Sequence, residues 1–210
     1  MSEPDPHRPP GHRRRTVDHF DSSYSAQPPW DIGHPQPAFV EIADAGKLRG
    51  RVLDVGCGTG EHVLMAAERG LPALGVDSAP TAIAIAERKA RERGLDARFL
   101  VWNAVDLESL GERFDTVLDS GLFHVFDDDD RARYVDSLRA ATAPGGRYHM
   151  VCFSDREPGD WGPRRVTRDE IEQSFTDGWR VEAIEPVVFE TTPGPGQVLA
   201  WRAEISRMSG

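Results

Sequence analysis

A glycine-rich turn between an apolar strand and a helix is the feature that most limits how this chain can fold. Residues 51–55 form a short, mostly apolar stretch typical of a buried strand, and Gly56, Gly58 and Gly60 follow at once. A helix is predicted directly afterwards, over 61–69. Glycines allow a sharp turn and a close ligand, and the start of a helix presents free N–H groups. This arrangement suits a nucleotide-like ligand that carries a carboxylate or a phosphate.

The rest of the chain repeats the alternation of strands and helices, which predicts an α/β fold with a parallel sheet covered on both faces. Short apolar runs predict six further strands, over 73–77, 98–102, 114–118, 148–153, 180–184 and 197–205. Other helices are predicted over 17–25, 38–45, 80–93, 129–141 and 168–175. The last of these is marked by Thr167 with Glu170 three residues later, which is the spacing of a capping box.

Composition limits the partners that this chain can have. It has 210 residues and a formal net charge of −10, and a field of that sign repels phosphate backbones and anionic membranes. Its apolar runs extend over only a few residues, whereas a membrane-spanning helix needs about 20. Cys57 and Cys152 do not make a disulfide framework, and no apolar run follows the basic N-terminus as in a secretory signal. We therefore expect a cytoplasmic protein that binds neither nucleic acid nor membranes.

Three parts are expected along the chain. Residues 1–15 contain four prolines and the basic cluster Arg13–Arg15, and this composition cannot bury enough surface to offset the entropy of ordering. We predict a disordered tail there, in which the arginines form a solvated charge run; an anchor for nucleic acid or lipid is the alternative. Residues 16–46 are expected to form an N-terminal helical segment, and residues 47–210 the core domain.

The glycine spacing argues against a dinucleotide. Dinucleotide-binding folds have the order G-x-G-x-x-G, which would put the third glycine at position 61, where this chain has Glu61. A pyrophosphate at the turn would then face a carboxylate. An NAD-dependent oxidoreductase is therefore disfavoured.

The segment Asp54-Val55-Gly56-Cys57-Gly58-Thr59-Gly60 resembles the first motif of class I S-adenosylmethionine-dependent methyltransferases. The resemblance implies a Rossmann-like, seven-stranded, mostly parallel sheet with an antiparallel last strand. It also implies S-adenosylmethionine as the cofactor and S-adenosylhomocysteine as its product. In that family the turn wraps the methionine and adenosine parts of the cofactor. The implied cofactor-binding residues of the turn are Asp54, Gly56, Cys57, Gly58 and Gly60; a glycine-rich turn without a ligand is the alternative.

Two later strand ends fit the same family. Asp77 ends the second predicted strand, where an acidic side chain can accept hydrogen bonds from both ribose hydroxyls, and Ser78 follows it. An Asx turn before Pro80 is the alternative. After the third strand, Asn103 stands where family members often carry an Asp beside the adenine. Its oxygen can accept a bond from the adenine amino group, and the Ala104 N–H can serve a ring nitrogen.

The end of the fourth predicted strand is expected to face the reacting methyl group, because ligand chemistry collects at the carboxyl ends of strands in α/β sheets. Asp119 and Ser120 are predicted on the cofactor side, with Phe123 as an apolar wall. His124 is the predicted catalytic residue, since an imidazole titrates near neutrality and can remove a proton from the acceptor. A structural histidine is the alternative. The acids over 127–130 suit a helix start and do not converge on one point, so no metal site is expected.

The stretch Pro29-Trp30-Asp31-Ile32-Gly33-His34-Pro35-Gln36-Pro37 resembles the P-W-D-x-G-x-P-x-P segment of thiopurine S-methyltransferases and halide/thiol methyltransferases. Small heterocycle and toxin methyltransferases share it. In those relatives the N-terminal helix and this tryptophan form a lid over cofactor and acceptor. Tyr24 and Trp30 are therefore implied to contact the acceptor and shield it from water. A purely structural Trp30 that caps a helix pair is the alternative.

The loop over 154–166 is expected to form the other wall of the acceptor pocket, because long loops in compact domains are often binding loops. Trp161 and Arg164 are its predicted substrate-binding residues, and Arg164 and Arg165 are candidates to pair with an acidic substituent. A solvated loop is the alternative.

Together these features predict an enzyme that moves a methyl group from S-adenosylmethionine to the sulfur, nitrogen or oxygen of a small molecule, such as a heterocycle, a thiol or a phenol. Holding the two reactants in line can supply about 7–11 kcal/mol of the barrier. The alternatives are methylation of a macromolecule and non-catalytic binding of S-adenosylmethionine. We expect a monomer or a weak homodimer.

Overall fold

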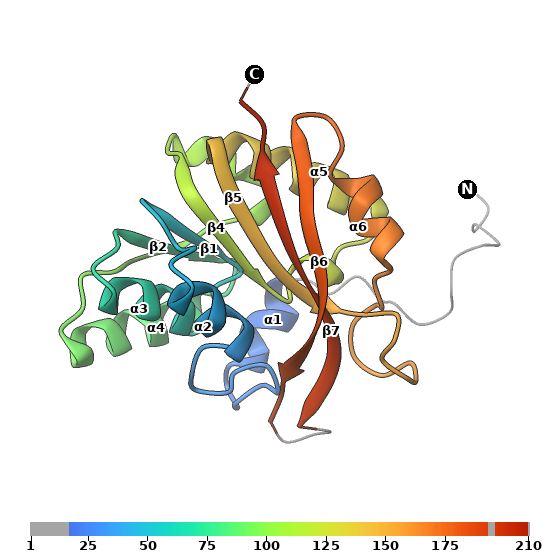
Figure 1. Cartoon of the computed structure of the whole chain (residues 1–210). Coiled ribbons are helices and arrows are strands. Elements are labelled where there is room, and N and C mark those ends of the chain that lie inside the picture. Colours follow the sequence, from blue (N-terminus) through green and yellow to red (C-terminus); the bar gives the residue numbers. More distant parts are fainter. Residues whose placement is uncertain (1–16, 193–195, 210) are drawn as a thin grey trace, which may run out of the picture.

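The computed structural model describes residues 17–192 and 196–209, so the tail predicted over 1–15 lies outside the described residues. These residues form a seven-stranded sheet in the order β3-β2-β1-β4-β5-β7-β6 (Figure 1). The strands are β1 (Val52–Val55), β2 (Ala73–Asp77), β3 (Arg98–Val101), β4 (Phe114–Ser120), β5 (Thr142–Phe153), β6 (Trp179–Glu190) and β7 (Gln197–Arg207). Within this sheet β7 is antiparallel to both of its neighbours, and the other pairs are parallel. The predicted fold class is confirmed.

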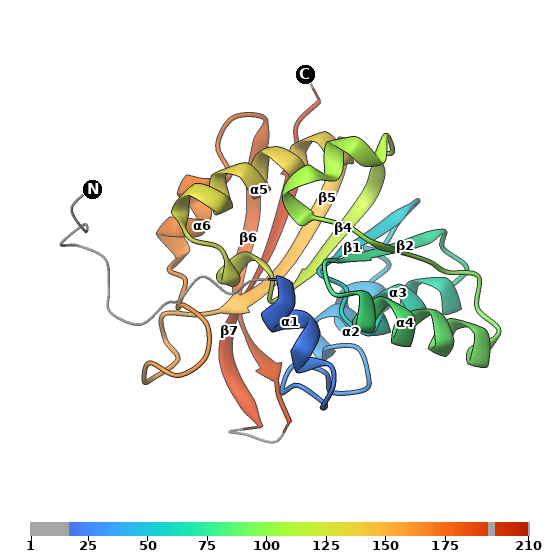
Figure 2. The ribbon, with the colours of Figure 1, turned by 180° about the vertical axis from the view of Figure 1, so that it is seen from behind.

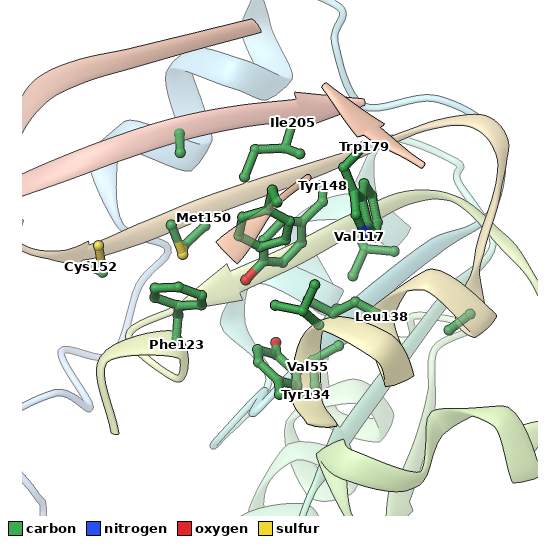
Figure 3. Close-up of a cluster of buried hydrophobic side chains, with 14 of the residues drawn as sticks. Val55, Val117, Phe123, Tyr134, Leu138, Tyr148, Met150, Cys152, Trp179 and Ile205 are labelled. Carbon is green, nitrogen blue, oxygen red and sulfur yellow. The ribbon is translucent and has the colours of Figure 1, made fainter. Parts of the chain in front are cut away.

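Helices cover both faces of the sheet. The α-helices are α1 (Val17–Ser23), α2 (Pro37–Asp44), α3 (Glu61–Glu68), α4 (Pro80–Arg93), α5 (Asp128–Ala141) and α6 (Arg168–Ser174), and the 3-10 helices are η1 (Ala104–Leu110) and η2 (Phe123–Val125). One apolar cluster joins α2, α3 and α4 to one face, and a second joins α5 and α6 to the other face (Figure 3). All four residues of β1 are buried between these layers, which explains why the stretch that predicted this strand is mostly apolar. In the described parts of the chain, none of the helices is long and apolar enough to cross a membrane.

The C-terminal strands are longer than the sequence predicts. β6 and β7 pair along their whole length, from Glu190 and Gln197 to Trp179 and Arg207, with one bulge. The hairpin therefore continues past the strand predicted over 180–184. Pro186 lies within β6, which is tolerated because β6 is an edge strand. β5 likewise begins at Thr142, directly after α5, because its first residue already pairs with β4.

The parallel strands end at one edge of the sheet, and α1 lies across that edge (Figures 1 and 2). Asp21 of α1 accepts hydrogen bonds from the Thr81 N–H, at 2.8 Å, and from the Thr81 hydroxyl, at 3.2 Å. Thr81 is in the first turn of α4, whose backbone N–H groups lack partners within the helix. The Asp21 side chain of α1 therefore caps the N-terminus of α4, and this contact fixes α1 beside the glycine turn.

Candidate active site

The glycine turn is tied to β2 by its own backbone. The N–H groups of Gly56 and Cys57 both donate to the Val76 carbonyl, at 2.8 and 3.0 Å. Gly58 has a left-handed φ of +52°, and a Cβ placed there would lie 2.9 Å from the Tyr24 hydroxyl. A side chain at position 58 would therefore be strained and would fill the space between the turn and the N-terminal segment. The Tyr24 hydroxyl lies on this side of the turn.

Asp77 faces the same turn from the end of β2. Its carboxylate accepts hydrogen bonds from the Gly58 N–H, at 2.8 Å, and from the Ala79 N–H, at 2.9 Å. Burial raises the pKa of Asp77, and the two N–H groups act in the opposite direction. Each carboxylate oxygen keeps a lone pair for a further donor, such as a sugar hydroxyl. Ser78 lies half-buried next to it.

Asp54 is the least satisfied side chain of this region. It is fully buried in β1, and neither carboxylate oxygen has a hydrogen-bond partner among the described residues. The nearest cationic candidate is His62 in α3, whose Nδ1 lies 3.6 Å from Oδ2. Nε2 of His62 accepts the Gln36 N–H at 3.1 Å, so its proton is on Nδ1, toward Asp54. A buried carboxylate with unused acceptor capacity is suited to a cationic group such as an ammonium.

Two residues of the motif, Gly60 and Cys57, have structural roles. Gly60 has a φ of +87°, and a Cβ there would clash with Phe99 and Ala86, so this glycine is required for close packing of α3 on β3 and α4. The Cys57 thiol packs against Gly75 of β2, and burial raises its pKa well above the ordinary value. Cys57 and Gly60 can therefore meet a cofactor only through their backbone, and their predicted role in cofactor binding stays a prediction.

Glu61 also departs from the prediction. Its carboxylate does not face the glycine turn but is buried in ion pairs with Lys89, at 2.9 Å, and with Arg93, at 2.9 and 3.0 Å, both in α4. The Lys89 ammonium also donates to the Thr59 hydroxyl, which in turn donates to Asp31. The side chain that was expected to repel an anion therefore links the turn to α4 and to the N-terminal segment.

Asn103 and Ala104 lie at the end of β3, as predicted. The Asn103 side-chain oxygen accepts the Val105 N–H at 3.2 Å and so caps η1. Asn103 is exposed and its oxygen retains a second lone pair, so a contact with an adenine amino group remains a prediction. The Ala104 carbonyl accepts the Ser137 hydroxyl, which fixes this corner to α5.

Asp119 requires a correction. It was expected to face the cofactor, but its carboxylate is fully buried beneath the β4–η2 turn. It accepts the hydroxyls of Tyr148, at 2.7 Å, and Tyr134, at 2.9 Å, and the N–H groups of Leu122, at 2.7 Å, and Phe123, at 3.1 Å. Burial raises its pKa to about 6, against the lowering effect of these donors. Asp119 is therefore an internal anchor of the turn and has little capacity left for a ligand.

Phe123 is wrong as an acceptor wall for the same reason. It is fully buried among the side chains under α5 and α6 (Figure 3), stacked 5.8 Å from Phe175, and the Arg131 guanidinium lies 4.7 Å from its ring centre. The residue that takes the predicted place is Leu122, whose side chain would lie 3.1 Å from a Cβ at Gly56. Ser120, half-buried at the end of β4, remains a predicted cofactor contact.

His124 lies in η2, next to the end of β5. Its Nδ1 accepts the Phe153 N–H at 3.0 Å, and the two rings meet edge to face with their centres 4.9 Å apart. A Cβ at Gly121 would lie 3.4 Å from Nε2 of His124. Because residue 121 is glycine, its backbone lies close to this nitrogen. Phe153 also contacts the rings of Phe189 and Trp161, each with centres 5.6 Å apart. We call Leu122, His124, Phe153, Phe189 and Trp161 the acceptor wall.

The N-terminal segment covers this region. The Trp30 indole donates to the Tyr24 hydroxyl at 3.0 Å, above Gly58. Burial, more than the nearby Asp77 carboxylate, raises the pKa of Tyr24 above its ordinary range, so the hydroxyl stays protonated. The Gln36 side chain both accepts from and donates to the backbone of Glu190, at 2.9 Å each. The segment is therefore fixed at one end to α4 and at the other to the β6–β7 hairpin.

The loop over 154–166 is partly as expected. Trp161 is 39% exposed and packs on Phe153, as an acceptor-side residue can. Arg164, predicted to bind substrate, instead pairs with Asp128, at 2.6 Å, and with Glu170. Arg165 stacks between Phe153 and Trp161 and donates to carbonyls of its own loop. Both arginines hold the loop in shape, which corrects their predicted role.

The family follows from two comparisons. Residues 52–146 match a family model described as a methyltransferase domain. Over 180 residues the chain is 39% identical to the 2-heptyl-1-hydroxyquinolin-4(1H)-one methyltransferase of Mycobacteroides abscessus, and the match covers 80% of this chain and 79% of that protein. The chain belongs to the S-adenosylmethionine-dependent methyltransferases.

Two further comparisons, one with a sequence and one with a solved structure, agree with this family. A probable thiol methyltransferase 2 from Arabidopsis thaliana is 28% identical over 172 residues, which is 80% of this chain and 74% of that protein. A solved structure from work on the conversion of a disulfide bond into a thioacetal group during echinomycin biosynthesis is 38% identical, with a TM-score of 0.85. That match covers 92% of this chain and 93% of the other.

The residues present fit S-adenosylmethionine. The unsatisfied Asp54 carboxylate suits the α-ammonium of the methionine part, and Asp77 suits the ribose hydroxyls. Gly58 leaves the face of the turn open for the chain between them. When bound, the cofactor supplies an electrophilic methyl group on a sulfonium sulfur. The protein then has to hold this group against an acceptor.

Three residues of this site were missed by sequence reasoning. Gln36 and His62 connect the N-terminal segment to Asp54, and Leu122 meets Gly56. His62 lies in the first turn of α3, two residues after Gly60. This closeness to the glycine turn could have indicated that His62 belongs to the site. Leu122 and Gln36 carry no local signal, because their partners are distant in the chain.

Proposed function

We propose that this methyltransferase acts on a sulfur or oxygen atom of a small, flat heteroaromatic molecule. The observation that carries the proposal is the acceptor wall, which is apolar and aromatic and begins at Leu122, against Gly56 of the cofactor turn. Aromatic side chains recognise flat rings through large apolar contact and ring stacking. The polar side-chain atoms of the wall are few: the ring nitrogens of His124 and the indole N–H of Trp161.

The cover over the site supports a small acceptor. Tyr24 and Trp30 lie above the turn, and Trp30 packs against the cluster that contains Phe153 and Phe189. We propose that this segment acts as a lid that excludes water, which would otherwise solvate the nucleophile. A macromolecular acceptor would require its displacement, and the net charge of −10 opposes nucleic acid.

The relatives supply the two acceptor chemistries. One is named for a hydroxyquinolinone and another for thiols. Both kinds of molecule present an acidic group whose anion is a good nucleophile. We propose the same choice for this chain.

A methyl-transfer screen tests the proposal. The protein is incubated with S-adenosylmethionine and a panel of 1-hydroxyquinolin-4-ones, aromatic thiols, phenols and iodide, and products are followed by mass spectrometry. We expect transfer to at least one hydroxyquinolone or aromatic thiol and none to a peptide or an RNA. S-adenosylhomocysteine, but not NAD, should raise the melting temperature. Binding of S-adenosylhomocysteine together with no transfer to any small acceptor would favour a non-catalytic binding protein.

A further inference from the structure

The Asp54 carboxylate is fully buried, and neither of its oxygens accepts a hydrogen bond from the part of the chain that the structure describes. Burying a charge is costly unless a donor or a cation can reach it. His62 of α3 lies beside this carboxylate, with Nδ1 3.6 Å from Oδ2. That separation is within the range of an ion pair but is longer than a hydrogen bond, so both carboxylate oxygens keep their capacity for a ligand.

The other ring nitrogen of His62 contacts the N-terminal segment. The Gln36 N–H donates to Nε2 at 3.1 Å, so the neutral ring carries its proton on Nδ1, on the side of Asp54. The ring also lies against Phe39 of α2, with the two ring centres 4.6 Å apart, and this contact holds its orientation. His62 therefore connects β1 to the N-terminal segment, with one ring nitrogen toward each.

Gln36 is the residue at which the N-terminal segment is fixed to the sheet. Its side chain is buried and pairs with the Glu190 backbone in both directions, at 2.9 Å each. Pro35 and Pro37 flank it, and its own φ of −59° and ψ of 135° are those that a residue before proline prefers. The backbone of this junction has little freedom, so the position of the Gln36 N–H and the position of the segment before it are tied together.

We propose that His62 is a positioning residue that couples cofactor binding to the anchoring of the N-terminal segment. Through the proton on Nδ1 the ring orients the Asp54 carboxylate for the α-ammonium of the methionine part, and through Nε2 it holds the Gln36 N–H. The coupling is reciprocal. An ammonium that fixes Asp54 also fixes the ring and the Gln36 anchor, and a loosened anchor weakens the binding of the ammonium. This coupling does not depend on which acceptor the enzyme methylates.

Two ligands that differ only in the ammonium test the coupling in the wild-type protein. S-adenosylhomocysteine carries this group, and its deamino analogue, the adenosyl thioether of 4-mercaptobutyrate, lacks it. We expect S-adenosylhomocysteine to bind about 10-fold more tightly in calorimetry and to slow the amide exchange of Gln36 about 10-fold, as measured by NMR. The analogue at saturation should leave this exchange rate nearly unchanged. Equal slowing by the two saturating ligands would overturn the proposal.

Two variants at position 62 separate the two contacts of the ring. His62→Leu removes both, and it should lower the affinity for S-adenosylhomocysteine about 10-fold while hardly changing that for the analogue. His62→Asn places an amide donor near the Nδ1 position but cannot accept the Gln36 N–H. It should keep the preference for the ammonium and lose the slower exchange at Gln36. His149→Leu removes another buried histidine, on β5, and is the control that should behave as the wild type.

Two results would overturn the proposal. An equal loss of affinity for both ligands in His62→Leu would mean that this residue only supports the fold. Slower exchange retained at Gln36 in His62→Asn would mean that the ring does not couple the two elements. If His62→Leu does not fold, His62→Asn and the comparison of the two ligands on the wild type decide between these roles. These measurements use no methyl acceptor, so a protein that passes them but methylates no small molecule would refute the proposed function alone.

Discussion

The cofactor half and the acceptor half of this site are built differently. The cofactor half consists of backbone groups and two carboxylates on the neighbouring strands β1 and β2, close together in the sequence. The acceptor half brings together the β4–η2 turn, the end of β5, the β6–β7 hairpin and the loop over 154–166. Recognition through backbone requires glycine and so leaves a pattern in the sequence, whereas recognition by packed side chains depends on contacts between distant residues.

The largest effect is expected from Gly58→Val, which would break the cofactor half. A β-branched residue at a φ of +52° is strained, and its Cβ would lie 2.9 Å from the Tyr24 hydroxyl, in the space that the ligand needs. We expect no measurable binding of S-adenosylhomocysteine by calorimetry. Gly94→Ala is the matched control, since Gly94 has a φ of +64° but open space around it. It should cost about 1 kcal/mol of stability and leave affinity intact. If Gly58→Val bound S-adenosylhomocysteine normally, the prediction that the cofactor binds at the glycine turn would be wrong.

Asp119→Asn tests whether the acceptor half depends on an internal anchor. An amide has one acceptor oxygen where the carboxylate has two, so a Tyr134 or Tyr148 hydroxyl loses its partner. We expect about 2–3 kcal/mol less stability in urea unfolding, with affinity for S-adenosylhomocysteine retained. If the variant lost affinity for S-adenosylhomocysteine but not stability, Asp119 would have to contact the cofactor, as the sequence predicted.

The same variant has a pH signature. The pKa of Asp119 is about 6 in the folded protein and near 3.8 when unfolded, so between these values the native state binds the extra proton. The contribution of this group to the free energy of unfolding therefore falls as pH rises from about 4 to about 6. The wild type should show this slope relative to Asp119→Asn. Parallel curves for the two proteins would contradict the raised pKa.

Asp77→Asn is expected to have a smaller effect, confined to the cofactor half. Replacing the carboxylate weakens hydrogen bonds to a charged acceptor, which contribute about 1.5–3 kcal/mol, so affinity for S-adenosylhomocysteine should fall about 10- to 100-fold. Stability should fall by about 1 kcal/mol, because the amide has one acceptor oxygen and only one of the Gly58 and Ala79 N–H groups keeps its partner. Asp96→Asn, at an exposed position, is the control. Unchanged affinity would contradict the ribose contact.

The smallest effect is expected from Arg164→Gln. Arg164 bridges Asp128 and Glu170 at a partly exposed position, where such pairs contribute about 1 kcal/mol or less. The KM for any acceptor should not change, whereas Trp161→Ala should raise it. If Arg164→Gln raised the KM for acidic acceptors only, Arg164 would bind the substrate, as the sequence predicted.

Much of the cofactor half could be predicted from the sequence. The strand, the glycines and the helix after them are local features, and Asp77 follows from the length of one strand–helix–strand unit. Even there, the chemistry of the side chains was partly misjudged. Glu61 turns to Lys89 and Arg93, and Gly60 is required for packing against Phe99, because these partners come from α4 and β3.

The acceptor half shows where such prediction ends. Asp119, Phe123 and His124 were all expected to meet a ligand because they follow the strand predicted over 114–118. The structure turns Asp119 and Phe123 inward, to tyrosines and apolar residues of α5, β5 and α6. Leu122 instead lies against Gly56, and the buried His124 packs on Phe153. A short turn exposes some of its side chains and buries others, and only the elements packed beneath it decide which.

By itself, the sequence determined the order of strands and helices, the fold class and the glycine turn, since each depends on neighbouring residues and on backbone geometry. Tertiary structure alone decided the direction of each side chain at the strand ends and the hydrogen bond that His124 Nδ1 accepts. The latter depends on one N–H of Phe153, which is 29 residues away in the chain and 3.0 Å away in space. Proton positions follow from the donor that faces a ring nitrogen, and that donor is known only once the strands are assembled.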